Sequence, residues 1–334
     1  MLAAIIAAAV ALACPALAAD PIVLGLPLDC EVGETCAVQQ YVDHDASPAA
    51  RDYHCGTLSY DGHNGTDFRL PTMAAQRAGV NVLAAADGVV ARVRGDMAEH
   101  AAGAAAGAVT ADSRMCGNGV VITHPDGWET QYCHMAKDSV RVEPGERVSA
   151  GTPIGRVGLS GATVFPHLHF TVRHQGAIVD PFAFQAAADS CGGGTPLWRP
   201  ALRASLAYRA RSVLNAAFAA NAVSMEAVEA GTIDTPTNEA GGPEAMVAYV
   251  RSIGLKRGDV QGLLIEAPDG SVLVDHVAKA LDRHEAQSLL FVGKRRPPAG
   301  WPFGRYRATY RVLADGQPVL EKSFSLMLAP RPGP

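Results

Sequence analysis

The sequence lacks an excess of basic residues. Among 334 residues, 28 are Lys or Arg and 33 are Asp or Glu, which gives a formal net charge of −5. A nucleic-acid-binding surface needs cations that neutralise phosphates, so the composition argues against a nucleic-acid partner. Hydrophobic residues make up 48% and charged residues 18%, an ordinary globular composition, and the length suggests about two domains.

Long hydrophobic runs are also absent after the N-terminal segment, so we expect no stable membrane span. Residues 2–13 form an apolar run that is too short to cross a bilayer, and a small-residue A-x-A-like site follows it. This is the pattern of a secretory signal peptide. We therefore predict that residues 1–19 are a signal and that the protein is exported, to the periplasm or the cell exterior. Anchoring as a lipoprotein through Cys14 is the less favoured alternative.

No C-x-x-C pair occurs, which disfavours a structural zinc site. Removal of the signal with Cys14 would leave six of the seven cysteines, and an even set in an exported protein predicts disulfides. We expect one short loop closed by a disulfide, one disulfide across a predicted hairpin, and a third pair formed by the remaining cysteines: Cys30 with Cys36, Cys116 with Cys133, and Cys55 with Cys191.

Two β-rich regions flank a glycine-rich segment over residues 191–196. Short β-prone runs alternate with turn signals between residues 80 and 180, and strand-like runs return between residues 262 and 328. The alanine-rich segments 201–220 and 225–230 are expected to be short helices or irregular connectors. We predict a mainly β protein, with one antiparallel domain over residues 20–195 and a β-sandwich-like, immunoglobulin-like accessory domain over residues 196–334.

An H-E-x-x-H motif is missing, but two other patterns combine metal-binding side chains. His63 and Asp67 form an H-x-x-x-D pattern whose glycines argue against a helix, and a straight strand would separate them by about 13 Å. The chain must therefore bend between them to bring both to one ion. His167 and His169 alternate along a predicted strand and project from one face. His134 follows a predicted hairpin strand.

Together these motifs resemble the lysostaphin-like, LytM-type zinc metallopeptidases, which hydrolyse peptide bonds of peptidoglycan. The order of the motifs matches, and so does the glycine- and valine-rich stretch over residues 142–161; the resemblance covers residues 56–184. It implies an antiparallel β-sheet with a groove. It also implies one Zn²⁺ per chain, bound by His63, Asp67 and His169, and two catalytic histidines that are not ligands, His134 and His167.

Three protein ligands leave one coordination position for water, which is typical of catalytic zinc. Either His167 or His134 would then act as the general base, and we prefer His167. The resemblance implies an exported metalloendopeptidase that acts on peptidoglycan stems or cross-links, with an envelope protein as a second partner through the accessory domain. Two rival hypotheses are a non-catalytic activator of another wall hydrolase and a zinc protease that acts on proteins.

Three further histidines are interpreted as unrelated to this site. His124 lies in a predicted Pro-Asp-Gly turn, where exposure is expected. His276 and His284 lie among the strand-like runs of the C-terminal region, where we expect surface positions.

Overall fold

The computed structural model describes residues 20–100, 112–187, 190–237 and 242–329. The predicted signal, residues 1–19 with Cys14, lies outside these ranges. Strands make up 43% and helices 7% of the structure, and all pairs between its strands are antiparallel. The prediction of a mainly β, antiparallel protein is confirmed. No helix in the described ranges has the length and apolar character needed to cross a membrane.

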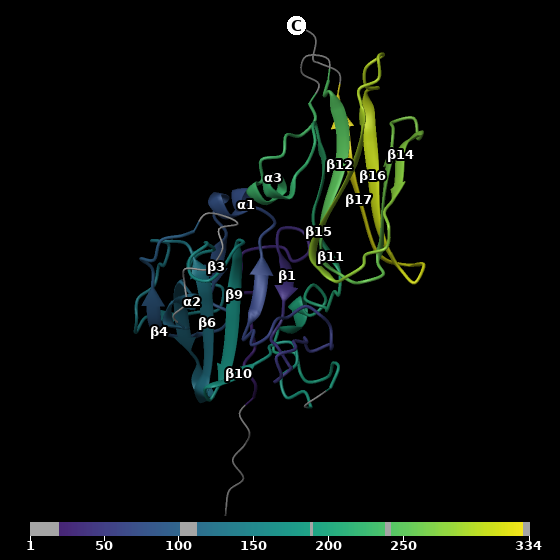
Figure 1. The fold of residues 1–334 in the computed structure, drawn as a ribbon. Coiled ribbons are helices and arrows are strands. Elements are labelled where there is room, and N and C mark those ends of the chain that lie inside the picture. Colours follow the sequence, from purple (N-terminus) through teal and green to yellow (C-terminus); the bar gives the residue numbers. More distant parts are fainter. Residues whose placement is uncertain (1–19, 101–111, 188–189, 238–241, 330–334) are drawn as a thin grey trace, which may run out of the picture.

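One eight-stranded sheet dominates the N-terminal part (Figure 1). Its order is β1-β2-β9-β6-β5-β4-β7, and β10 pairs with β9. The bounds are Ala37–Gln40 for β1, Thr66–Arg69 for β2, Gly88–Arg94 for β4, Asn118–Thr123 for β5, Trp128–Met135 for β6, Arg147–Val148 for β7, His167–His174 for β9 and Ala177–Val179 for β10. A small separate sheet pairs β3 (Asn81–Leu83) with β8 (Pro153–Arg156).

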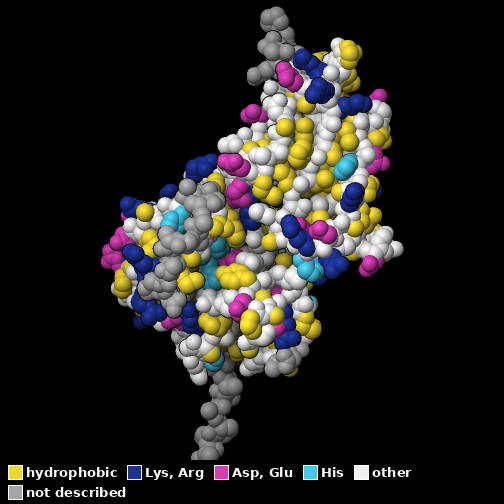
Figure 2. Space-filling view, viewed as in Figure 1, with side chains coloured by type: hydrophobic (Ala, Val, Ile, Leu, Met, Phe, Trp, Pro, Cys, Tyr) yellow, Lys and Arg dark blue, Asp and Glu magenta, His cyan; other side chains and the backbone are white. Residues whose placement is uncertain are grey.

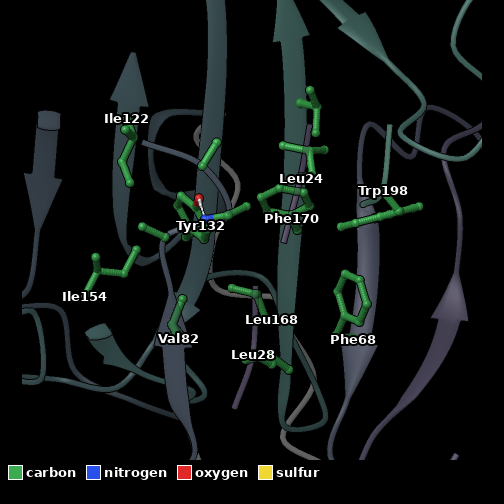
Figure 3. Close-up of a cluster of buried hydrophobic side chains, with 14 of the residues drawn as sticks. Leu24, Leu28, Phe68, Val82, Ile122, Tyr132, Ile154, Leu168, Phe170 and Trp198 are labelled. Carbon is green, nitrogen blue, oxygen red and sulfur yellow. Dashed lines mark hydrogen bonds between the residues drawn. The ribbon is translucent and has the colours of Figure 1, made fainter. Parts of the chain in front are cut away.

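Side-chain alternation gives the eight-stranded sheet two different faces. In β9, Leu168 and Phe170 are fully buried and pack on the hydrophobic core with Phe68 of β2 and Tyr132 of β6 (Figure 3). Successive residues of a strand point to opposite faces, so the histidines between these apolar residues lie on the other face. The apolar face fixes the register, because a shift by one residue would bury the wrong set.

A residue that follows the glycine-rich segment also packs into the core of this sheet. Trp198 is 1% exposed and contacts Phe68, Phe170 and Phe182. The chain at Trp198 forms an isolated bridge with Leu24. The segment after residue 195 therefore contributes to the N-terminal core before the C-terminal strands begin.

Two further sheets make up the C-terminal part (Figure 1). Their orders are β11-β12-β15 and β14-β13-β16-β17, and side chains from both sheets share a second hydrophobic core. The bounds are Ser212–Ala219 for β11, Ala245–Leu255 for β12, Val260–Glu266 for β13, Val272–Val277 for β14, Glu285–Arg295 for β15, Gly304–Ala314 for β16 and Gln317–Leu328 for β17. We refer to these two sheets as the C-terminal sheets.

One expectation for the alanine-rich segments is wrong. Met225–Ala230 does form a helix, α3, but Ser212–Ala219 forms strand β11 rather than a helix or connector. Ladder hydrogen bonds to β12 and burial of Leu214 and Phe218 outweigh the helix propensity of its alanines. Strand β12, at Ala245–Leu255, was not anticipated.

The remaining helical elements are short. Helix α1 spans Met73–Ala78 and α2 spans Asp112–Met115, while Pro125–Gly127 and Pro200–Leu202 are 3₁₀ turns. The side chains of Thr72 and Ser224 cap the N-termini of α1 and α3. Helices α1 and α3 contact each other where the N-terminal part meets the C-terminal sheets (Figure 1).

A buried ion cluster joins the two parts beside these helices. Glu229 of α3 accepts a hydrogen bond from Arg69 of β2 at 2.5 Å and another from Arg251 of β12. Arg69 also donates to Gln39 at 2.6 Å. Both arginine side chains are almost fully buried, so one carboxylate balances two buried cations.

All three predicted disulfides are confirmed. The structure pairs Cys30 with Cys36, Cys55 with Cys191 and Cys116 with Cys133.

Candidate metal centre and flanking histidines

His63, Asp67 and His169 converge in one cluster. One ligand atom from each lies within 4.8 Å of the other two. Asp67 and His169 are direct cross-strand partners in β2 and β9. Asp67 Oδ1 lies 3.2 Å from His63 Nε2 and 2.9 Å from His169 Nδ1, and the two nitrogens are 3.2 Å apart. The structure therefore brings together the three residues that the sequence offered as ligands.

The predicted bend between His63 and Asp67 is present. The chain bends at Gly65, immediately before β2 begins at Thr66. A Cβ at position 65 would lie 2.7 Å from His169 Nε2 and 2.8 Å from the Phe170 carbonyl oxygen. Only glycine fits there, because any side chain would displace the imidazole or the strand behind it.

The outer nitrogens of the two imidazoles face acceptors. His63 Nδ1 lies 2.6 Å from the Tyr41 carbonyl oxygen and His169 Nε2 lies 2.9 Å from Asn64 Oδ1. Each outer nitrogen must donate a proton to its acceptor, so the inner nitrogen of a neutral ring carries a lone pair. Two nitrogen lone pairs and a carboxylate oxygen therefore point at one another.

Such an arrangement requires a positive charge among the three atoms. Although burial acts to lower the pKa of His63, Asp67 raises it above its usual value. A proton is one such charge, and a metal ion is another. Two imidazole nitrogens and one carboxylate oxygen are a donor set that zinc accepts, so the residues fit the metal that the sequence implies.

His134 and His167 flank this cluster without joining it. Their ring centroids are 4.6 Å apart, and the His134 ring lies 5.9 Å from that of His169. His134 Nδ1 donates to the Ser160 carbonyl at 2.8 Å, and His167 Nδ1 lies 3.0 Å from the Phe165 carbonyl. In both rings the proton is thus held at Nδ1, and Nε2 remains an acceptor.

Burial controls the protonation of these two histidines. Burial, followed by the charges of His167 and His169, holds the pKa of His134 well below its usual range. Burial also lowers the pKa of His167, although Asp67 opposes this effect. Both rings are therefore neutral near pH 7 and can accept a proton. Burial alone would raise the pKa of Asp67, but the neighbouring imidazoles outweigh it and hold that pKa well below its usual range.

A disulfide constrains the backbone next to His134. The residue has a positive φ of 61°, a conformation that non-glycine residues rarely adopt. The disulfide between Cys116 and Cys133 fixes the preceding position, and the His134 amide donates to the Cys116 carbonyl at 2.8 Å. The disulfide thus ties β6 to the segment before β5 at the residue next to the flanking histidine.

Sequence reasoning missed two neighbours of the cluster. Tyr60 places its ring 4.5 Å from that of His63, and the residue is 49% exposed. Asn64 provides the acceptor for His169. Asn64 lies inside the H-x-x-x-D motif and so carried a positional signal, whereas nothing in the sequence marked Tyr60. Figure 2 shows histidine side chains at the surface of the lower part of the molecule, and the His169 side chain is 12% exposed.

The other histidines lie elsewhere, and one expectation about them is wrong. His124 is 8% exposed rather than on the surface. Its Nδ1 lies 2.7 Å from the Asp87 carbonyl oxygen and its Nε2 2.8 Å from Thr130 Oγ1, and these contacts draw the ring into the sheet. His276 and His284 are exposed, as predicted.

Comparisons with known proteins identify the region that contains the cluster. Residues 61–181 match the model of peptidase family M23. The chain is 32% identical over 130 residues to the peptidoglycan DD-endopeptidase ShyA of Vibrio cholerae, a match that covers 39% of this chain and 24% of ShyA. It is 40% identical over 68 residues to protease LasA of Pseudomonas aeruginosa, covering 18% of this chain and 16% of LasA.

A solved structure also matches over part of its length. The crystal structure of a zinc-containing peptidase from Vibrio cholerae is 28% identical, covers 44% of this chain and 39% of that chain, and has a TM-score of 0.28. The chain thus spans well under half the length of each of these three proteins.

Proposed function

We propose that this chain is an exported zinc metalloendopeptidase of the LytM type, since residues 61–181 match the model of peptidase family M23. Its substrate is peptidoglycan, cut at a peptide bond of the stems or cross-links. The observation that carries the proposal is the convergence of two imidazole nitrogens and one carboxylate oxygen within 4.8 Å. The similarity to ShyA supports the choice of substrate.

His63, Asp67 and His169 would hold one zinc ion. When bound there, zinc supplies Lewis-acid polarisation of a carbonyl and makes water more acidic. The chain contributes the orientation of the ligands: the Tyr41 carbonyl holds His63, and Asn64 holds His169. Such outer hydrogen bonds fix the tautomer of a ligand histidine and raise its basicity.

His167 is the preferred general base. Its Nε2 carries a lone pair and lies 3.5 Å from Asp67 Oδ1, at the edge of the cluster. Its lowered pKa keeps the ring neutral, so it can take a proton from an attacking water. His134, which lies next to His167 and is held by Ser160, is assigned to orient the substrate through the acceptor at its Nε2, because a neutral ring with its proton at Nδ1 has no N–H left to donate to an oxyanion.

The domain division follows the same proposal. We assign residues 20–195 to the peptidase domain and residues 196–334 to an accessory β-rich domain. Separate hydrophobic cores support a division into two domains, but the first core extends past residue 195, because it includes Trp198 and Leu206. We propose that the accessory domain contacts another envelope protein. Three disulfides support export to the periplasm or the cell exterior.

Mass spectrometry of fragments released from purified peptidoglycan tests this function. We expect new amine and carboxyl ends with zinc-loaded protein, and none with a chelated sample or with His169→Ala. His276→Ala, an exposed histidine of the C-terminal sheets, serves as the matched control and should retain activity. Absence of release by zinc-loaded protein would contradict the proposal, and cleavage of a protein instead would favour the protease alternative, which the similarity to LasA supports.

A further inference from the structure

The face of the eight-stranded sheet that carries the metal cluster continues beyond the cluster. One row of cross-strand partners runs from β9 to β4 and consists of Thr171, Gln131, Val121 and Arg92. Thr171 Oγ1 lies 3.1 Å from His169 Nε2, so the row begins at the cluster. Neighbouring strands lie about 4.8 Å apart, so the backbone of Arg92, three strands from that of Thr171, lies about 14 Å away from it.

A cavity of about 300 Å³ lies at the far end of this row. Gly117 and Gly119 line it together with the disulfide-bonded Cys116, Gln131 and two arginines, Arg92 and Arg94. At Gly119 a Cβ would lie 2.3 Å from the Tyr132 carbonyl oxygen. A side chain therefore cannot occupy this position, and the floor of the cavity stays open.

The two arginines belong to one strand and one face. Arg92 and Arg94 are separated by two positions in β4, so their side chains project to the same side of the sheet. Arg94 Nη1 donates to the Gly117 carbonyl at 3.1 Å, which directs its guanidinium toward the cavity lining. The Arg92 side chain is 72% exposed and pairs with Glu129 only at 3.5 Å, and exposed ion pairs of this kind contribute little to stability.

Positive charge accumulates here although the chain as a whole is acidic. Glu129 is shared between Arg92 and Arg173, the latter at 3.1 Å. Among the described side chains that line the cavity, both charged groups are arginines. Guanidinium groups bind carboxylates through paired hydrogen bonds, and glutamine adds an uncharged donor.

We propose that this cavity is a substrate subsite for a peptide carboxylate, with Arg92 and Arg94 as the residues that bind it. The inference rests on the proposed peptidase function and specifies its substrate: a peptide bearing a free carboxylate about three to four residues from the scissile bond. An extended peptide advances about 3.3 Å per residue, so four residues cover about 13 Å, close to the length of the row, and three cover about 10 Å.

Matched synthetic peptides test this subsite with the full chain loaded with zinc. The peptides differ in one side chain, a carboxylate or its carboxamide, placed three or four residues from the scissile bond on either side. We expect kcat/KM to favour one carboxylate peptide by about 10- to 100-fold, because a hydrogen bond to a charged group is that strong. Equal rates for all carboxylate and carboxamide pairs would overturn the proposal.

The double variant Arg92→Gln, Arg94→Gln should lose this preference and treat the two peptides alike. The matched control is Arg305→Gln, Arg307→Gln, which changes two exposed arginines with the same spacing on β16. This control should keep the preference. A double variant on β4 that still preferred the carboxylate would overturn the assignment of these residues.

Direct binding separates failure of the subsite from failure of the peptidase function. In calorimetry with the uncleaved peptides, we expect the carboxylate peptide to bind wild type about 10- to 100-fold more tightly than the β4 double variant. Binding without hydrolysis would contradict the proposed function and uphold the subsite. Hydrolysis without any carboxylate preference in binding or rate would uphold the proposed function and contradict the subsite.

Discussion

The eight-stranded sheet and the C-terminal sheets treat buried polar groups differently. In the C-terminal part, two buried polar side chains have partners within the chain: Asp259 accepts from Arg211 at 2.6 and 2.7 Å, and Tyr310 donates to Gln261 at 2.8 Å. Gln287 Oε1 of β15 is buried there without a hydrogen-bond partner among the described residues. In the eight-stranded sheet, three hydrogen-bond acceptors from His63, Asp67 and His169 face one another at the candidate metal site. Buried polar groups are normally satisfied within the chain, so a cluster of like groups marks the place where something outside the chain completes the structure.

Replacing one buried aspartate by asparagine in each part should give the largest difference in effect between the two parts. Asp67→Asn removes the anionic ligand, and we expect loss of bound zinc and of at least about 10³-fold in activity, since the metal contributes several kcal/mol. Asp259→Asn, which removes a buried partner of Arg211, should keep zinc and activity but lose about 3 kcal/mol of stability. Metal analysis, peptidoglycan turnover and thermal unfolding check both. Zinc retained by Asp67→Asn would contradict the contrast.

His167→Ala tests whether the flanking histidines act on the reaction rather than on the metal. We expect kcat to fall by about 10²- to 10⁴-fold, the usual contribution of a general base, while zinc remains bound. His124→Ala provides a matched control, because it also removes a buried histidine of this sheet but one outside the cluster. Loss of zinc from His167→Ala would mean that this residue supports the metal instead.

Glu229→Gln tests whether the two parts are independent. The change leaves Arg69 and Arg251 buried without their shared counter-charge, and we expect unfolding to become easier by about 3–5 kcal/mol. Glu226→Gln, at an exposed position of the same helix, is the matched control and should change stability by less than about 1 kcal/mol. Equal denaturation midpoints for the two variants would show that the ion cluster does not couple the parts.

Buried histidines of the eight-stranded sheet also predict a pH dependence. Burial lowers the pKa of His124 and His134 from an ordinary value of 6.5. Below about pH 6.5 these histidines bind protons in the unfolded chain but stay neutral in the folded chain. The free energy of unfolding therefore falls as the pH drops from about 6.5 toward the folded-state pKa values. We expect Tm to decrease from pH 7.5 to pH 5.5, with a shallower slope in His124→Gln. A steeper slope in that variant would refute this explanation.

The family resemblance implied the ligand set, and local patterns account for only part of its geometry, because the pairing of β2 with β9 that joins Asp67 to His169 is long-range. The H-x-x-x-D pattern required a bend, which Gly65 provides, and alternation alone placed His167 and His169 on one face. The role of Tyr60 could not be read in the same way. Its contact with His63 depends on how the loop before β2 folds back, which no periodicity encodes.

Long-range pairing explains the other failures. Ser212–Ala219 is rich in alanine and became a strand only because β12 pairs with it across a separation that the sequence does not signal. His124 was expected to be exposed in a turn, but the Asp87 carbonyl, 37 positions away in the sequence, and Thr130 of the following strand β6 draw it inward. Two of the predicted disulfides, Cys30–Cys36 and Cys116–Cys133, join cysteines 6 and 17 positions apart, whereas Cys55–Cys191 was predicted only as the remaining pair and spans 136 positions.

We propose that one zinc ion bound by His63, Asp67 and His169 makes this sheet a peptidase. Titration of the chelated protein with Zn²⁺, with bound metal and new amino ends from peptidoglycan measured in the same samples, tests it most directly. We predict that both signals rise together and saturate at one zinc per chain, and that neither rises in His63→Ala. Full hydrolysis by the chelated protein, or stoichiometric zinc in His63→Ala, would contradict the account.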